Sequence, residues 1–271
     1  MLKTMIKCTL SLSICALFAD AHASFVNVTK ASSMMELNGV LTSVHFNDGD
    51  TFKILDGELE GARVRVVGIN TLETYGPVHQ WLGSSQEYLW DIAHSATVMV
   101  QEGSWHCETS GKKDFYGRLL ATCDDLSLAL VAAGLAHVYS IDSNMGPKNY
   151  IKKQKIAQEE RVGMWQFGIP QFIITSLHSA DEGSDSPYNR LISTKDGSSE
   201  LWHHNDNYGT CENVCLEDDG NEGDVTCMIY VPYGNRYGRN RPDCLRSSKQ
   251  EINNGIRRIK SYGRANHQSQ S

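Results

Sequence analysis

The stretch LTSVHFNDGDTFKILDGELEGARVRVVGI, residues 41–69, decides the expected fold. It holds short runs of alternating or β-branched residues, at positions 41–46, 52–55 and 62–69. The turn-forming sequences NDGD and DG separate these runs. We therefore expect this stretch to form strands joined by tight turns.

Helices follow the strand-rich stretch. Apolar periodicity predicts a helix at 79–96, strands at 97–100 and 118–123, and helices at 127–139 and 149–166. The order of strands, helix, strands and two helices favours an α+β fold, in which helices decorate a small antiparallel barrel.

Amino-acid composition and net charge exclude several classes of protein. The 271 residues are 40% apolar and 21% charged, which excludes wholesale disorder and collagen-like structure and allows one large or two small domains. The 25 basic and 32 acidic residues give a net charge of −7. This balance argues against a protein that coats nucleic acid by bulk charge.

The first 23 residues have the layout of a secretory signal peptide. Lys3 and Lys7 precede an apolar run at 8–18, and Ala21 and Ala23 stand where a signal peptidase reads small residues. The run is shorter than the roughly 20 apolar residues that span a bilayer. We therefore expect an exported protein, secreted or periplasmic, without a retained anchor.

Six cysteines remain after the leader. An even number in an oxidising compartment favours disulfides, and the alternatives are free thiols or a zinc site built from the last four. Cys227 and Cys244 do not form the second close pair usual in such zinc sites. The pairing of the last four stays open. The six are Cys107, Cys123, Cys211, Cys215, Cys227 and Cys244.

The composition changes after residue 170. Residues 171–200 are expected to be a linker or surface loop, and 201–271 a cysteine-containing extension too poor in apolar residues to fold without disulfides or docking. Residues 181–233 carry a charge of −10 and residues 234–271 a charge of +7. The basic tail is either a solvated surface, a partner for the acidic stretch, or an arm that contacts phosphates.

Three short segments at expected strand ends carry the chemistry. They are DGDT at 48–51, RVVGINTLET at 65–74 and DFYGR at 114–118. Hard oxygen ligands can hold Ca²⁺, which polarises a phosphoryl oxygen. Two guanidinium groups can bind the phosphate and stabilise developing charge, while a free carboxylate activates water. The set suits phosphodiester hydrolysis.

In order and spacing these segments resemble the motifs of the staphylococcal nuclease (thermonuclease) family. The resemblance covers roughly residues 37–168, including GLA at 134–136 and GMW at 163–165. It implies a five-stranded OB-type barrel with three helices, a nuclease domain over 24–170, and Ca²⁺-dependent endonuclease activity on DNA and RNA.

The resemblance assigns a role to each matching residue. Asp50 corresponds to the metal-binding aspartate, and Thr71 to the residue whose backbone carbonyl helps to coordinate Ca²⁺. Glu73 corresponds to the glutamate that acts as general base. Arg65 and Arg118 correspond to the two catalytic arginines.

Other positions carry weaker matches or departures. Tyr116 matches a tyrosine that contacts phosphate, and Asp48 an acidic residue that supports the metal region from outside. Asn70 stands where a second metal-binding aspartate is usual; its amide oxygen can still ligate Ca²⁺, with one negative charge fewer. Leu72 replaces a proline and Phe115 a basic residue.

The sequence assigns neither a second site tyrosine nor a histidine metal ligand. The second family tyrosine has no clear match, because Tyr139 and Ser140 both lie close to its position. No helix-spaced or strand-spaced metal-ligand set emerges among the histidines considered, which are His45, His106, His137, His203 and His204.

Cys107 and Cys123 flank the loop and strand that carry Tyr116 and Arg118. In a barrel hairpin these cysteines face each other, so we predict a disulfide between them. In the chain-entropy model a loop of about 15 residues closed in this way adds about 3 kcal/mol of stability.

The residues therefore favour a monomeric endonuclease that acts on DNA and/or RNA. The alternative is a nucleic-acid-binding module without activity on an OB-type scaffold, a doubt raised by Asn70 and Leu72. A third possibility is that the tail is an adaptor for a protein or surface partner.

Overall fold

The computed structural model describes residues 32–217, 225–246 and 256–260, the last as backbone only. The predicted signal peptide, residues 1–23, lies outside these ranges. In the part of the chain described, none of the helices combines the length and apolar character needed to cross a membrane.

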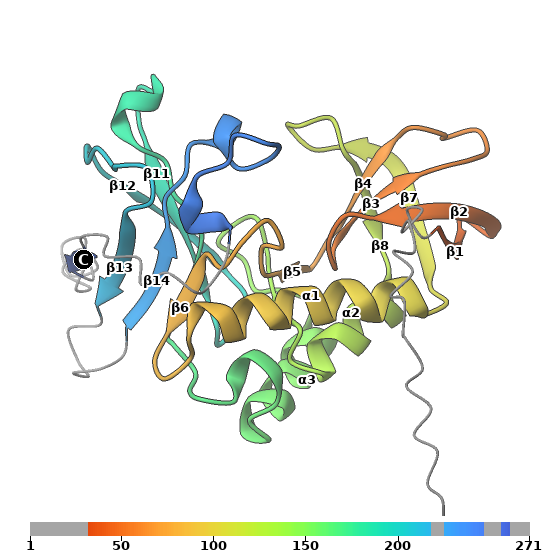
Figure 1. Cartoon of the computed structure of the whole chain (residues 1–271). Helices are drawn as coiled ribbons and strands as arrows, with labels where there is room; N and C mark the ends of the chain where they lie inside the picture. Colours follow the sequence, from red (N-terminus) through yellow and green to blue (C-terminus); the bar gives the residue numbers. More distant parts are fainter. Residues whose placement is uncertain (1–31, 218–224, 247–255, 261–271) are drawn as a thin grey trace, which may run out of the picture. The chain divides into compact units, whose positions relative to one another are not determined.

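A closed β-barrel organises the first part of the fold (Figure 1). Neighbouring strands pair in the order β1-β2-β3-β4-β8-β7, and parallel pairing of β1 with β7 closes the barrel. The strands are β1 (Ser33–Leu37), β2 (Val40–Phe46), β3 (Thr51–Ile54), β4 (Arg63–Val66), β7 (His106–Lys113) and β8 (Leu119–Thr122). The expected barrel is present, with six strands where five were expected.

Two barrel strands were not expected: β1, which precedes the stretch that was expected to form strands, and the more unusual β7. Its sequence HCETSGKK is polar and mostly exposed, so no apolar alternation marks it. Pairing with β8 and β1 makes it a strand. The other strands alternate as expected: β4 buries Val64 and Val66 and turns Arg63 and Arg65 away from the barrel core.

The three expected helices are present with different ends. They are α1 (Gln86–Glu102), α2 (Asp124–Ala132) and α3 (Lys148–Glu159). The prediction of a strand at 97–100 is wrong, because α1 continues through it. Ala96 and Val100 are both buried, and residues four apart share a helix face.

The helix expected at 127–139 ends early, at Ala132. Gly134 has φ +63°, and a Cβ there would lie 2.3 Å from the carbonyl oxygen of Val162, so the chain must turn at this glycine. Beyond it, β9 (Ala136–Val138) pairs antiparallel with β5 (Ile69–Thr71). The start of the helix expected at 79–96 is likewise a strand, β6 (His79–Trp81), and Ser85 caps α1 by accepting a hydrogen bond from the Tyr88 amide.

The stretch 171–200 is not the expected linker. It contains β10 (Phe172–Ser176) and β11 (Tyr188–Ser193), which form a three-stranded antiparallel sheet with β12 (Ser199–His203). Ile174 and Leu191 in these strands are buried. The Ser-, Asp- and Gly-rich residues form the connections between strands, which is why composition alone suggested a loop.

The C-terminal strands dock on the first part of the chain. A four-stranded sheet has the order β15-β13-β14-β6, so β6 pairs with β14 (Val225–Ile229) across a long stretch of sequence. The other strands are β13 (Asn213–Glu217) and β15 (Ile256–Lys260). This docking supplies the packing that the apolar-poor extension lacks.

Three disulfides are present. The Cys107–Cys123 bond joins β7 to the start of α2, as the sequence suggested. Cys215–Cys227 links β13 to β14, and Cys211–Cys244 links the residues just before β13 to the short turn at Asp243–Leu245. The last four cysteines are therefore bonded to one another and do not form a zinc site.

His79 predicts a pH dependence of folding. Its Nε2 lies 3.1 Å from the carbonyl oxygen of Ile174, and burial lowers its pKa to about 4 from 6.5. Since the unfolded chain binds a proton below pH 6.5 and the folded chain does not, stability should fall as pH falls from 6.5 to about 4. The slope from this residue approaches about 1.4 kcal/mol per pH unit.

Urea unfolding between pH 7 and pH 4.5 measures this effect. His79→Gln should show a shallower loss of stability than the wild type. An identical slope in both proteins would contradict the prediction.

Candidate active site

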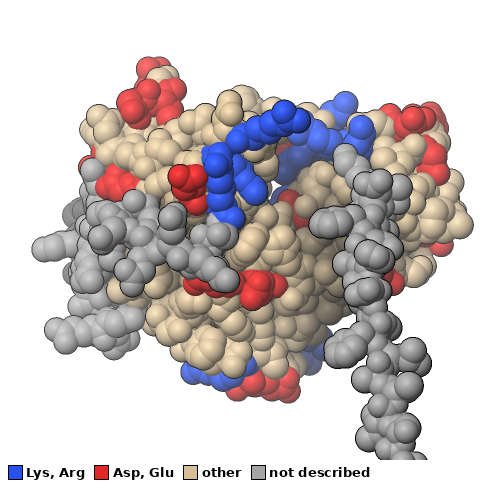
Figure 2. All heavy atoms as spheres, in the orientation of Figure 1, with Lys and Arg blue, Asp and Glu red and all other residues tan. Residues whose placement is uncertain are grey.

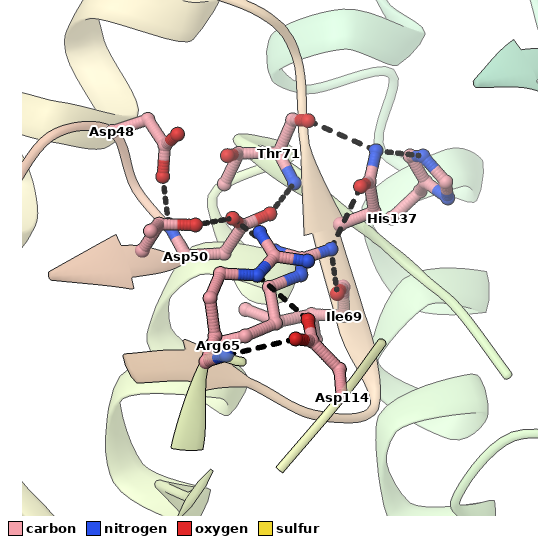
Figure 3. Close-up of polar contacts among 10 residues, drawn as sticks. Asp48, Asp50, Arg65, Ile69, Thr71, Asp114 and His137 are labelled. Atoms are coloured by element: carbon pink, nitrogen blue, oxygen red, sulfur yellow. Dashed lines mark hydrogen bonds and ion pairs between the residues drawn. The ribbon is translucent and has the colours of Figure 1, made fainter. Parts of the chain in front are cut away.

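A buried ion pair joins Asp50 to Arg65 (Figure 3). Asp50 lies at the end of the turn between β2 and β3, and its Oδ1 pairs with Arg65 Nη1 and accepts from Thr51 Oγ1 at 3.0 Å. Its Oδ2 accepts from the Thr71 amide at 2.7 Å. Burial disfavours the charged carboxylate, but the Arg65 charge and the Thr71 amide outweigh it and lower the pKa of Asp50.

Arg65 is held from a second side by β5. Strand alternation turns its side chain away from the barrel core, and its Nη2 donates to the carbonyl oxygen of Ile69 at 3.2 Å and to Asn70 Oδ1 at 2.8 Å. The guanidinium orientation is thereby set by three neighbouring segments: the turn before β3, β4 itself and β5.

Asn70 extends this network to β9. Its Nδ2 donates to the Thr71 carbonyl oxygen at 2.9 Å and to His137 Nε2 at 3.1 Å. Burial lowers the pKa of His137 to about 4, so its imidazole is neutral, and Nδ1 donates to the carbonyl oxygen of Val138 at 3.1 Å. Asn70 is therefore both acceptor and donor in a continuous chain of hydrogen bonds.

His137 is the site residue that the sequence did not reveal. Asn70 and His137 are register partners in the β5–β9 pair. The sequence did not predict this pairing, because the apolar periodicity of residues 127–139 is that of a helix. A helix would not place His137 beside β5.

Glu73 lies half-buried just after β5. Burial and the charge of Asp50 raise the pKa of Glu73 to about 6, while Arg236, Arg65 and Arg118 act in the opposite direction. Both arginines expected to be catalytic therefore lie close to this carboxylate, together with a third from the C-terminal part of the chain.

Asp48 adds a third carboxylate. Its Oδ1 accepts from the Asp50 amide at 3.1 Å. Burial and the negative charges of Asp50 and Glu73 raise the pKa of Asp48 well above its usual value. The fold thus places three carboxylates where their charges oppose one another.

Asp114 positions Arg118 in the β7–β8 hairpin. Its Oδ1 accepts from the amides of Tyr116 and Arg118, both at 2.9 Å, and its Oδ2 accepts from Arg118 Nε at 2.7 Å. The Arg118 guanidinium lies 5.5 Å from the centre of the Tyr116 ring. Tyr116 is 59% exposed and Phe115 is 99% exposed, so the hairpin presents two aromatic side chains to solvent.

Tyr139 lies near the same arginines. Burial raises its pKa, and the charges of Arg190, Arg65 and Arg118 act in the opposite direction. Of the two open positions, Tyr139 is the one for which the structure shows this proximity to Arg65 and Arg118.

The family match agrees with this arrangement. Residues 63–167 match the family model of staphylococcal nuclease homologues. These residues form a staphylococcal nuclease homologue domain. The match confirms the resemblance seen in the sequence and includes Arg65, Glu73 and Arg118, while the C-terminal strands β10–β15 lie outside it. No curated protein matches the chain.

The candidate site offers oxygen donors of the kind that Ca²⁺ prefers. They are the carboxylates of Asp48 and Asp50 and the carbonyl of Thr71. Within the described ranges no three His, Cys, Asp or Glu side chains converge to hold a metal by themselves. Asn70 Oδ1 accepts a hydrogen bond from Arg65. The donor types fit a hard cation, which would also balance the opposed carboxylate charges.

The Asp50–Arg65 ion pair predicts how variants of these two residues change the free energy of unfolding. Asp50→Asn leaves the Arg65 charge buried without its counter-charge and should cost about 3–5 kcal/mol of unfolding free energy. The double variant Asp50→Asn/Arg65→Met removes both charges and should be more stable than the single variant.

Denaturant unfolding of the three proteins tests this pattern. Asp56→Asn is the matched control, because Asp56 is exposed. A double variant less stable than Asp50→Asn would contradict the importance assigned to the pair.

Proposed function

We propose that the chain is an exported, monomeric, Ca²⁺-dependent endonuclease that hydrolyses phosphodiester bonds of DNA and/or RNA. One observation carries the proposal: the stretch 63–167, which matches the staphylococcal nuclease homologues, brings Arg65 of β4 and Arg118 of the β7–β8 turn close enough to Glu73 for both charges to act on its carboxylate. Two cations and one carboxylate at a common site are the groups that phosphodiester hydrolysis requires.

Arg118 is prepared to bind a phosphate. Asp114 occupies its Nε, and among the described residues no hydrogen-bond acceptor takes its two terminal nitrogens. These nitrogens form the planar fork that binds phosphate oxygens in bidentate fashion. Together with Arg65, Arg118 stabilises the negative charge that develops on the phosphorus oxygens during attack.

Glu73 acts on the attacking water. A pKa of about 6 leaves its carboxylate ionised at neutral pH and still basic enough to accept a proton. Burial and the neighbouring Asp50 charge are the causes of this value. Glu73 thus orients the water and accepts its proton.

Asp48, Asp50, Asn70 and Thr71 are the residues that would hold Ca²⁺ in this proposal. When bound, the ion supplies Lewis-acid polarisation of a phosphoryl oxygen. The protein groups named above bind the phosphate and move the proton.

Export is supported by two observations. Residues 1–23 have a signal-peptide layout, and the chain carries three disulfides, which persist in oxidising compartments. Either the periplasm or the medium is compatible with them.

Cleavage of plasmid DNA and of RNA tests the activity. We expect cleavage with Ca²⁺ and none with EDTA. Binding of nucleic acid without cleavage at any divalent-cation concentration would instead support the alternative, a nucleic-acid-binding module without activity.

The catalytic roles predict specific losses. Glu73→Gln should lower the cleavage rate about 100- to 10,000-fold, because no carboxylate accepts the proton. Arg118→Ala should lower it about 100- to 1,000-fold through lost charge stabilisation. The matched controls Glu60→Gln and Lys155→Ala change exposed charges outside the site and should retain wild-type rates.

Asn70→Asp restores the usual family carboxylate. The added charge should lower the Ca²⁺ concentration that gives half-maximal activity. An aspartate cannot donate to the Thr71 carbonyl or to His137, so the variant should also lose about 1–3 kcal/mol of stability. A Ca²⁺ titration of activity and urea unfolding measure the two effects; an unchanged Ca²⁺ requirement would contradict a metal-ligand role at this position.

A further inference from the structure

The C-terminal arm, residues 233–246, lies beside the active site although it lies outside the family match. It contains two short 3-10 turns, η3 (Tyr233–Asn235) and η4 (Asp243–Leu245), and carries four arginines against one aspartate. It includes the start of the basic tail, for which the sequence left a solvated surface, an acidic partner or a phosphate contact open.

Several contacts fasten the arm to the chain just after Glu73. Arg241 Nη1 donates to the carbonyl oxygen of Tyr75 at 2.8 Å, and the Tyr75 and Tyr237 rings lie 5.5 Å apart. A Cβ at Gly76 would lie 2.6 Å from the Leu245 carbonyl oxygen, so the arm and this loop touch backbone to backbone. The Cys211–Cys244 disulfide holds the end of the arm.

Arg236 is the group that the arm brings to the site. Its Nε donates to the carbonyl oxygen of Val231 at 2.9 Å, and its guanidinium lies 5.9 Å from the centre of the Tyr233 ring. Its positive charge lowers the pKa of Glu73, as the charges of Arg65 and Arg118 do. The contacts of Arg241 with Tyr75 and of Leu245 with Gly76 thus hold the arm that carries Arg236 beside the loop that follows Glu73.

Among the described residues, no ion pair joins the arm to the acidic stretch before it. In the described part of the chain, the carboxylate that pairs with an arm arginine is Asp243 of the arm itself, 3.2 Å from Arg246. Figure 2 shows Lys and Arg side chains gathered in a band that runs from the region of the arm toward the β7–β8 hairpin, with acidic atoms visible below it.

Two exposed aromatic side chains accompany this charge. Tyr233 is 62% exposed and Tyr237 is 58% exposed, and their rings meet edge to face at 6.2 Å. The β7–β8 hairpin presents the same combination, with Tyr116 against Arg118. Tyrosine faces next to guanidinium groups are the elements with which proteins bind single-stranded nucleic acid, where unpaired bases stack on the rings.

We propose that the C-terminal arm is a second nucleic-acid-binding wall of the active site, in which Arg236 binds a backbone phosphate and Tyr233 and Tyr237 stack on bases of a single strand. This inference rests on the proposed nuclease function for its substrate. The arm adds Tyr233, Arg236 and Tyr237 to the site, and these residues lie outside the stretch that matches the staphylococcal nuclease homologues.

Fluorescence anisotropy of a labelled single strand of about 10 nucleotides tests the arm, in EDTA so that no cleavage occurs. Arg236→Ala should weaken binding about 10-fold and reduce the slope of log affinity against log salt by about 0.7, as for one lost phosphate contact. Arg236→Lys should recover most of the affinity. Lys155→Ala, which removes one charge on α3, is the matched control and should bind like the wild type.

The tyrosine side chains should contribute to the binding of single strands but not to the binding of duplexes. Tyr233→Leu/Tyr237→Leu should weaken single-strand binding about 10-fold and leave binding of the corresponding duplex within about twofold. Thermal unfolding of each variant, compared with the wild type, checks that the arm is still folded, and the Arg236→Lys variant tests the charge with the smallest change in shape.

Wild-type affinity in Arg236→Ala and in the tyrosine variant would overturn the proposal, as would equal losses on single strands and duplexes. A wild-type chain that binds neither form would overturn it as well. Failure of the nuclease function has a different signature: the arm variants lose binding as expected, but the wild type never cleaves with Ca²⁺.

Discussion

The buried ion pair between Asp50 and Arg65 is the interaction on which the site depends. It connects the turn before β3 to β4, and the Thr71 amide joins both to β5. Asn70 carries the connection on to His137 in β9. The Asp50 carboxylate is paired with the Arg65 guanidinium, and Asn70 bonds to Arg65, Thr71 and His137, so the polar cluster tolerates burial beside the barrel core. The same cluster sets the direction of Arg65 and the position of the backbone that leads to Glu73.

The candidate site draws on both parts of the chain. The strand β6 follows the Glu73 loop, yet it pairs with β14 of the C-terminal sheet. Through this pairing and the contacts of Tyr75, the arm lies beside the loop that follows Glu73, and the charge of Arg236 lowers the pKa of Glu73 as those of Arg65 and Arg118 do. The net negative charge of the chain therefore says little about what the site binds, because Arg65, Arg118 and Arg236 gather around its carboxylates.

Several features followed from local sequence. The alternation in RVRV turned Arg65 out of the core, the DGD turn placed Asp50, and the six-cysteine count indicated disulfides. The errors had physical causes. The β7 strand is polar and is defined by its partners; β9 follows a helix-like pattern interrupted at Gly134; and β10 and β11 lie among turn-forming residues. In each case pairing with other strands decided the structure: β7 with β8 and β1, β9 with β5, and β10 with β11.

The sequence by itself determined the residue types of the site and the strand ends that carry them, because turn chemistry and alternation act over a few residues. The tertiary structure decided which partners those residues meet. The Asn70–His137 contact, the docking of β14 on β6 and the hydrogen bond of Arg241 to Tyr75 join residues far apart along the chain. Such contacts depend on how whole strands pack and pair, and no local pattern encodes them.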